Sequence, residues 1–266
     1  MFTDVEWVVP VTRHYHWLIK PMIMLCKKYL DIPITFWSDR PIPDLDRKHK
    51  AMEIFRLDSA IYRESVGDLI KNALNQIEKP IVAIILIDML PQNMVDLNRL
   101  ELLKCFMLEY PIARGNLHFA RNYEDQFKKY INTYTSDVLV RINNFYISKI
   151  SCYHELLSQI GSTSLLPALW NRKFLLEFIE DHWSFDKLEL PGQYKFMGHK
   201  HDHNCPYGSY VEWDRKNWFS VCTYPALYDN AHLCFTRAQD LVEIKNLKKE
   251  DKEYVMPYVP EELRIC

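Results

Sequence analysis

Hydrophobic and polar positions alternate in blocks along the first 120 residues, and the blocks predict strands and helices in turn. Short apolar runs with the length of strands occur at 5–9, 34–37, 52–57, 81–87 and 112–119. Apolar residues at helical spacing fill segments between them, at 18–29, 66–77 and 95–107. Alternation of this kind predicts an α/β fold, with a ligand crevice at the carboxyl ends of the strands.

The run at 81–87 is the strongest predicted strand, because every position is apolar and β-branched residues are frequent. Such a strand is typical of a parallel sheet that helices cover on both faces. It is expected to stop at Asp88. Pro21 suits the first turn of a helix, so the first helix is predicted to begin near residue 19, with 12–17 irregular before it.

The second half of the chain has a looser pattern. Residues 138–142 and 164–170 are predicted to be extended. Asn171 is expected to cap a following helix, because Phe174, Leu175, Phe178 and Ile179 form one apolar stripe. We expect one domain over residues 1–266, with the second half as a C-terminal elaboration.

Composition narrows the classes of protein that fit. The 266 residues are 48% hydrophobic, which is enough for a sizeable core. The net charge of −2 gives no overall positive potential that would attract a polyanion such as a nucleic acid. No apolar run reaches the length of a membrane span, so no transmembrane segment is predicted. Seven cysteines without a C-x-x-C pair favour a reducing, cytoplasmic location.

Three polar residues follow predicted strands directly: Thr12, Asp39 and Asp88. A carboxylate at the end of a buried central strand could hold a divalent cation against a diphosphate. The alternative for Asp88 is a cap that only terminates its strand, and the alternative for Asp39 is a turn before Arg40 and Pro41.

Short motifs carry a resemblance to a known family. WVVPVT at 7–12, FWSD at 36–39 and IILIDML at 84–90 resemble the nucleotide-binding half of GT-A glycosyltransferases, and SLLPALWNRKFL at 164–175 is similar to a segment of bacterial and viral glycosyltransferase-like proteins. The resemblance implies a GT-A-like, Rossmann-like and mostly parallel sheet flanked by helices. Residues 1–120 would be the nucleotide-binding half and 121–266 the acceptor-side half with the tail.

The same resemblance implies an activity: transfer of a sugar from a nucleoside-diphosphate sugar. Asp88 would hold Mn²⁺ or Mg²⁺ and the diphosphate, and His232 would be a late contact to the metal or phosphate. Asp39 would accept a hydrogen bond from the base, while Thr12 and Arg13 would meet the nucleoside and phosphate. The acceptor, whether glycan, lipid-linked or nucleic acid, stays unidentified.

The acceptor side has its own candidates. An inverting enzyme needs a general base on the acceptor hydroxyl, and Glu189 is preferred to Asp186 for that role by resemblance. Trp170 is a candidate to stack on an acceptor ring, and the alternative is a core tryptophan.

Two further hypotheses stay open. The family's D-x-D pattern would put a second acid at 86 or 90, where this chain has leucine. A catalytically degenerate binding or assembly module is therefore an alternative. The alternating His199, His201, His203 and Cys205 form a second alternative, a zinc site, although the spacing matches no established structural zinc motif. The chain lacks G-x-G-x-x-G, P-loop and G-x-S-x-G motifs, which disfavours three other enzyme classes.

Overall fold

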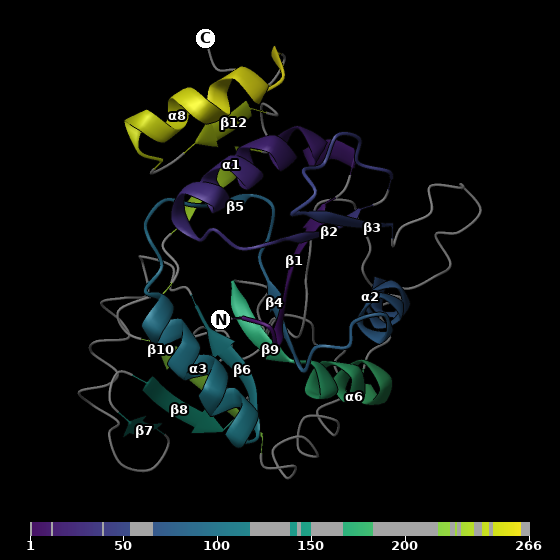
Figure 1. Ribbon diagram of the computed structural model, residues 1–266, viewed down its shortest axis with the longest axis vertical. Helices are drawn as coiled ribbons and strands as arrows, with labels where there is room; N and C mark the ends of the chain where they lie inside the picture. The colour runs from purple at the N-terminus through teal and green to yellow at the C-terminus, as the bar shows by residue number, and fades with distance from the viewer. Residues whose placement is uncertain are drawn as a thin grey trace.

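The structure is a computed structural model. It describes residues 2–11, 13–38, 40–53, 66–117, 139–142, 145–149, 167–182, 218–223, 227, 230–236, 241–244 and 247–261. Within these ranges the fold is α/β, with a mixed sheet and helices on both of its faces (Figure 1).

Nine strands of the described chain form the main sheet. They are β1 (Val5–Val11), β2 (Thr35–Ser38), β3 (Lys50–Glu53), β4 (Ile81–Ile84), β6 (Ile112–Asn116), β7 (Leu139–Ile142), β8 (Phe145–Lys149), β9 (Ala168–Asn171) and β10 (Phe219–Thr223). The spatial order is β3-β2-β1-β4-β9-β6-β10-β8-β7. Strands β3, β2, β1 and β4 are mutually parallel, whereas β9 runs antiparallel to its neighbours β4 and β6.

A second, three-stranded sheet lies beside the main one. Its strands are β5 (Met89–Pro91), β11 (Asn230–Thr236) and β12 (Leu241–Ile244), in the order β12-β11-β5. Both pairings are antiparallel. Because β5 follows β4 almost directly in the chain, the short connection between them joins the two sheets.

Helices alternate with the strands in the first half of the chain, and further helices follow β9 and β12. The described helices are the 3-10 helix η1 (Arg13–Leu18), α1 (Ile19–Tyr29), α2 (Val66–Asn75), α3 (Leu97–Glu109), α6 (Arg172–His182), α8 (Lys249–Val255) and the 3-10 helix η3 (Met256–Tyr258). None of the helices in these ranges has the length and apolar character needed to cross a membrane.

Alternating strand residues bury two separate apolar clusters, one on each face of the sheet. Trp7 and Val9 of β1 belong to the cluster that includes residues of α1 and α3. Val8 of β1 belongs to the cluster that includes Leu74, near the end of α2, and Phe174 of α6. The period of two along β1 therefore attaches helices to both faces of the sheet.

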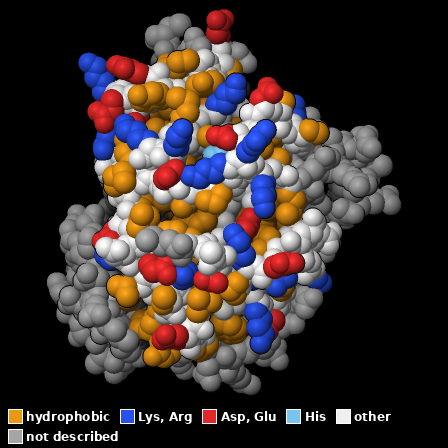
Figure 2. All heavy atoms as spheres, in the orientation of Figure 1, with side chains coloured by type: hydrophobic (Ala, Val, Ile, Leu, Met, Phe, Trp, Pro, Cys, Tyr) orange, Lys and Arg blue, Asp and Glu red, His pale blue; other side chains and the backbone are white. Residues whose placement is uncertain are grey.

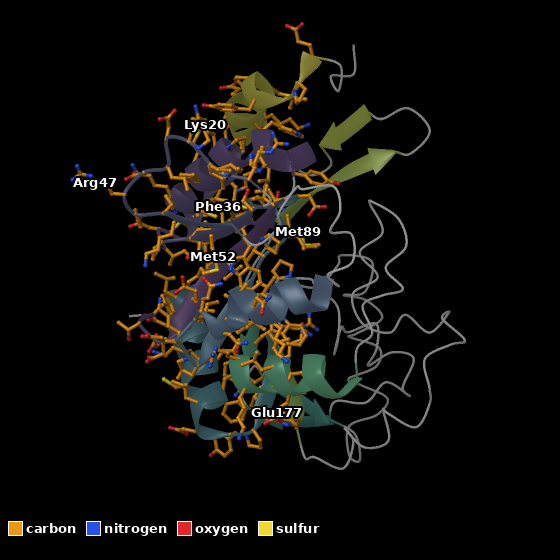
Figure 3. All side chains as sticks on the ribbon, turned by 90° about the vertical axis from the view of Figure 1, so that its right-hand side faces the viewer. Lys20, Phe36, Arg47, Met52, Met89 and Glu177 are labelled. Carbon is orange, nitrogen blue, oxygen red and sulfur yellow. The ribbon has the colours of Figure 1, made fainter. Side chains whose placement is uncertain are left out.

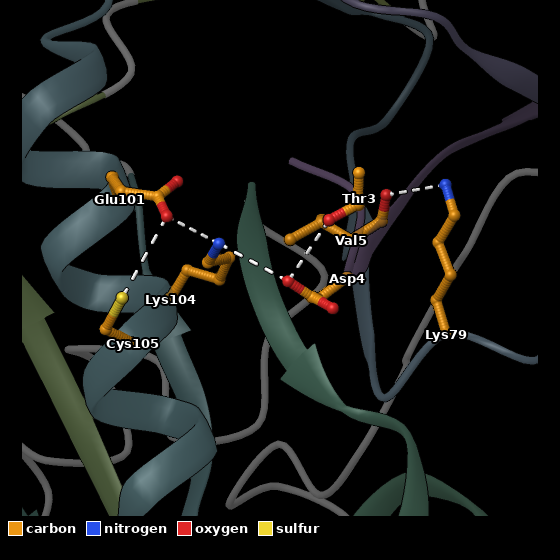
Figure 4. Close-up of polar contacts among 7 residues, drawn as sticks. All are labelled: Thr3, Asp4, Val5, Lys79, Glu101, Lys104 and Cys105. Atoms are coloured by element: carbon orange, nitrogen blue, oxygen red, sulfur yellow. Dashed lines mark hydrogen bonds and ion pairs between the residues drawn. The ribbon is translucent and has the colours of Figure 1, made fainter. Parts of the chain in front are cut away.

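The amino ends of the first strands are held by ion pairs. Lys104 of α3 contacts both Glu101 of its own helix and Asp4, which immediately precedes β1 (Figure 4). Lys79 pairs with Glu6 at 2.8 Å and donates to the Val5 carbonyl oxygen at 3.0 Å. These ion pairs lie at the amino edge of the sheet, and none of them involves the carboxyl ends of the strands.

The predicted elements agree with the structure in most of their positions, and three predictions need correction. The strand predicted over 81–87 ends at Ile84, because the chain turns there toward β5. Residues 12–17 were predicted to be irregular, whereas residues 13–18 form the 3-10 helix η1. The sheet was predicted to be mostly parallel, but it is mixed: β3, β2, β1 and β4 are parallel and β6 pairs with β10 in parallel, whereas β9, β8 and β7 form antiparallel pairs.

Candidate functional site

The candidate site lies at the carboxyl edge of the parallel strands. The chain runs outward from β1 through β2 to β3 on one side, and β4 lies on the other side of β1. The strand order therefore reverses between β1 and β4. Open α/β sheets bind ligands outside the carboxyl ends of the strands at such a point.

Asp88 is located in the turn that connects the two sheets. The Met89 N–H donates to the Leu86 carbonyl oxygen at 3.0 Å, which closes a four-residue turn with Asp88 at its third position. The turn is attached to the main sheet because the Ile85 N–H donates to the Val8 carbonyl oxygen at 3.0 Å. Asp88 itself is partly exposed to solvent.

The small sheet brings a second predicted residue to this turn. His232 of β11 is the register partner of Met89, the residue next to Asp88. The pairing continues with Ala231 opposite Leu90. Positions 88 and 232 are far apart in the sequence, and the antiparallel ladder makes their backbones close neighbours.

The ends of β1 and β2 meet at the same edge. Val11 and Ser38, their last residues, are register partners. They precede the predicted residues Thr12 and Asp39, which lie outside the described ranges. Arg13 begins η1, and only its backbone is described.

A histidine that the sequence reasoning did not select joins this edge. His16 Nε2 of η1 lies 3.0 Å from the hydroxyl oxygen of Ser38. The Ser38 hydroxyl donates to the Arg40 carbonyl oxygen at 2.7 Å and accepts from the Arg40 N–H at 3.2 Å. With the hydroxyl proton used in this way, His16 Nε2 is the donor to Ser38. This hydrogen bond connects η1, which follows β1, to the last residue of β2.

Sequence spacing offered no means of finding this contact. His14, Tyr15 and His16 follow one another in a polar loop, and the partner Ser38 is 22 residues away from His16. A strand-end rule points to Ser38, since it is the last residue of β2. The strand-end rule does not identify which of the neighbouring aromatic or histidine side chains contacts Ser38.

Trp170 lies in the core. It belongs to β9, between β4 and β6; its side chain is fully buried, and its ring stacks near Phe174 with centroids 6.4 Å apart. The guanidinium carbon of Arg114 lies 4.9 Å from the centroid of the same ring. A buried indole has no open face for an acceptor sugar, so the structure favours the core role over the predicted stacking role.

Polar residues that were not predicted are buried along β6. Arg114 and Asn116 are both almost completely inaccessible. Asn116 and Ile84 are register partners of the same residue, Ala168. Asn116 therefore lies at the carboxyl edge, in the same row as the end of β4.

The other predicted residues lie outside the part of the chain that the structure describes. They are Asp186, Glu189 and the histidine and cysteine series at 199–205. Among the described side chains, no group of three or more His, Cys, Asp or Glu gathers in a way that would hold a metal by itself. A cation at Asp88 would accordingly need ligand phosphates or water to complete its coordination.

Charge is mixed around the upper half of the molecule. On the face shown in Figure 2, acidic and basic side chains are interspersed with apolar ones over the described surface. Lys20 and Arg47 point away from the molecule, while Phe36 and Met89 lie within it (Figure 3). This face does not present the extended basic field of a polyanion-binding surface.

Comparison of the chain with protein-family models and with curated protein sequences gives no match.

Proposed function

We propose that this chain is a nucleotide-sugar-dependent glycosyltransferase with a GT-A-like fold. The observation that carries the proposal is the pairing of β5 with β11. It makes residue 232 the partner of Met89, beside Asp88, at the sheet edge where the strand order reverses. Two residues that the resemblance implies as metal or phosphate contacts thus lie close together along the backbone.

The proposed donor is a nucleoside-diphosphate sugar. Its base and ribose would lie against the ends of β1 and β2, with Thr12, Arg13 and Asp39 as the proposed contacts. Asp88 would face the diphosphate. A carboxylate in a partly exposed turn suits Mn²⁺ or Mg²⁺, because such cations are commonly held by one or two carboxylates together with substrate phosphates.

The chemistry would be displacement at the anomeric carbon with the nucleoside diphosphate as leaving group. A bound cation would offset negative charge as it develops on that leaving group. For an inverting reaction, Glu189 or Asp186 is the proposed base that removes the proton of the acceptor hydroxyl. Whether the acceptor is a glycan, a lipid-linked molecule or a nucleic acid is left open by this proposal.

One observation favours a second candidate function. Leu90 is fully buried in the core, and Leu86 is the other position where the family pattern would put a second acid. A chain that keeps the binding edge without that acid could be a catalytically degenerate module that binds nucleotides without turning them over.

Donor turnover separates the two functions. The wild-type chain and an Asp88→Asn variant are incubated with UDP-, GDP-, CDP- and dTDP-sugars in Mn²⁺ or Mg²⁺, and release of nucleoside diphosphate is measured. A transferase releases it from at least one donor, and Asp88→Asn lowers that rate by about tenfold or more. Binding without release in the wild type supports the module. Neither binding nor release with any donor contradicts the proposed function.

A further inference from the structure

The C-terminal helix α8 is fastened to α1 through a buried carboxylate. The side chain of Asp251 is 0% exposed and accepts hydrogen bonds from Lys28 Nζ and from the Tyr29 hydroxyl, each at 2.7 Å. In Figure 1, α8 lies along α1 at the top of the molecule. An acid is seldom buried so completely unless it is paired, so this contact is specific.

Tyr29 also holds the segment that follows the Asp88 turn. Its carbonyl oxygen accepts from the Val95 N–H at 3.3 Å. Lys248, which immediately precedes α8, donates to the Asn93 side chain at 2.7 Å. The ammonium groups of Lys28 and Lys248 lie 4.9 and 5.5 Å from the centroid of the Tyr29 ring. Residues 93–95 are therefore attached both to α1 and to the start of α8.

The two strands beside Asp88, β5 and β11, are both connected to the contacts between α1 and α8. β5 begins one residue after Asp88, packs against α1 and continues into residues 93–95. β11 carries residue 232 and pairs with β12, whose last residue Ile244 is the register partner of Leu233, and α8 follows β12 in the chain. The contacts of Lys28, Tyr29, Lys248 and Asp251, called here the α1–α8 latch, therefore hold the segment after β5 and the helix that follows β12.

We propose that the α1–α8 latch positions Asp88 relative to residue 232, with Tyr29 as the central positioning residue. None of its side chains needs to touch the ligand. The latch fixes the small sheet against α1, and the sheet fixes the turn. The metal-binding part of this inference rests on the proposed function; the structural coupling does not.

The test compares two variants, each of which removes one hydroxyl group that donates a hydrogen bond to a carboxylate. Tyr29→Phe removes the bond to Asp251 and keeps the ring beneath the two lysines. Thr35→Val removes the hydroxyl bond to Glu6, near the amino ends of β1 and β2. Lys248→Met is the second latch variant, and it removes the Asn93 bond from an exposed position without burying a polar group.

Hydrogen exchange of the full chain is the first readout. Tyr29→Phe is expected to speed amide exchange in residues 85–95 and 230–236, and Lys248→Met in residues 85–95. Thr35→Val should leave both segments unchanged. If Tyr29→Phe does not fold, Lys248→Met decides in the same way. Faster exchange confined to 247–261 would overturn the inference.

Binding is the second readout, with Mn²⁺ titrated in the presence of whichever of UDP, GDP, CDP or dTDP binds the wild type. The latch variants are expected to weaken Mn²⁺ about three- to tenfold while metal-free nucleotide affinity stays constant. Equal loss in Thr35→Val, or equal loss with and without metal, would show a general effect of stability and overturn the positioning role. If the wild type binds no nucleotide, the proposed function fails, and hydrogen exchange alone tests whether the latch positions the Asp88 turn.

Discussion

His49 shows how a single buried side chain links stability to pH. It lies just before β3 and is 8% exposed, and its Nδ1 accepts a hydrogen bond from the Ile34 N–H at 3.1 Å. Burial lowers the pKa of His49 below its ordinary value of 6.5, and the nearby Asp46 only partly opposes this effect. A protonated ring could not accept the Ile34 bond, so the folded state favours the neutral form.

This arrangement predicts a loss of stability in mild acid. Because the pKa of His49 is lower in the folded chain, its contribution is fully present above pH 6.5 and falls as the pH drops through the lowered value. His49→Asn keeps an acceptor near the Nδ1 position and cannot titrate. The variant should lose less unfolding free energy than the wild type between about pH 7.5 and about pH 5.5.

Urea unfolding at both pH values measures the two slopes. Other histidines titrate in both proteins, so the difference between the slopes isolates His49. Identical slopes for the wild type and His49→Asn would show that this histidine is not held neutral by the fold.

The packing of α3 on β6 depends on a glycine. A Cβ at Gly115 would lie 2.9 Å from Cδ2 of Leu103, a fully buried residue of α3. The helix can approach the strand closely only because position 115 has no side chain. This close contact keeps α3 against the strand that also carries Arg114 and Asn116.

Gly115→Ala is expected to lower the free energy of unfolding by about 1–3 kcal/mol, through overpacking against Leu103. Leu103→Val shortens the clashing side chain, so the double variant should be less destabilised than the sum of the two single changes. Chemical denaturation of all four proteins gives this coupling. Strict additivity would mean that the alanine is accommodated by movement elsewhere.

Local signals in the sequence were sufficient for several elements. Asn171 precedes an apolar helical stripe, and it does cap α6, since its side-chain oxygen accepts from the Phe174 N–H at 3.2 Å. Pro21 marked the first turn of α1 in the same way. These features depend on neighbours three or four residues away, so the sequence contains them directly.

Partners distant in the sequence could not be predicted. An extended segment over 164–170 was expected, and β9 covers Ala168–Asn171, but its insertion between β4 and β6 depends on pairing across the sheet. The three-residue strand β5 was not predicted, because it is too short to show a period of its own. Without β5, nothing in the sequence indicated that residue 232 lies beside the Asp88 turn.

The candidate residues were selected partly by position along a strand and partly by residue type. Asp88 was selected because it follows the most apolar run, and it lies in the turn between β4 and β5. Trp170 was selected for its ring, and that ring is buried. His16 was missed because its contact with Ser38 arises from the 3-10 turn of η1 rather than from spacing.

For the molecule as a whole, two sheets and the connection between them define the proposed site. The main sheet supplies the reversal of strand order, and the small sheet brings a distant segment to the Asp88 turn. The α1–α8 contacts join α1 to the helix that follows β12 of the small sheet. The central claim is that this assembly exists to present a carboxylate to a cation and a diphosphate.

Calorimetric titration of nucleoside diphosphates, with and without Mn²⁺, into the wild type and Asp88→Asn tests that claim most directly. We expect Mn²⁺ to tighten binding of at least one nucleoside diphosphate to the wild type by about tenfold, or 1.4 kcal/mol, and to have little effect on the variant. The metal-free affinities of the two proteins should agree. Equal Mn²⁺ enhancement in both proteins, or no nucleotide binding by the wild type, would contradict the account.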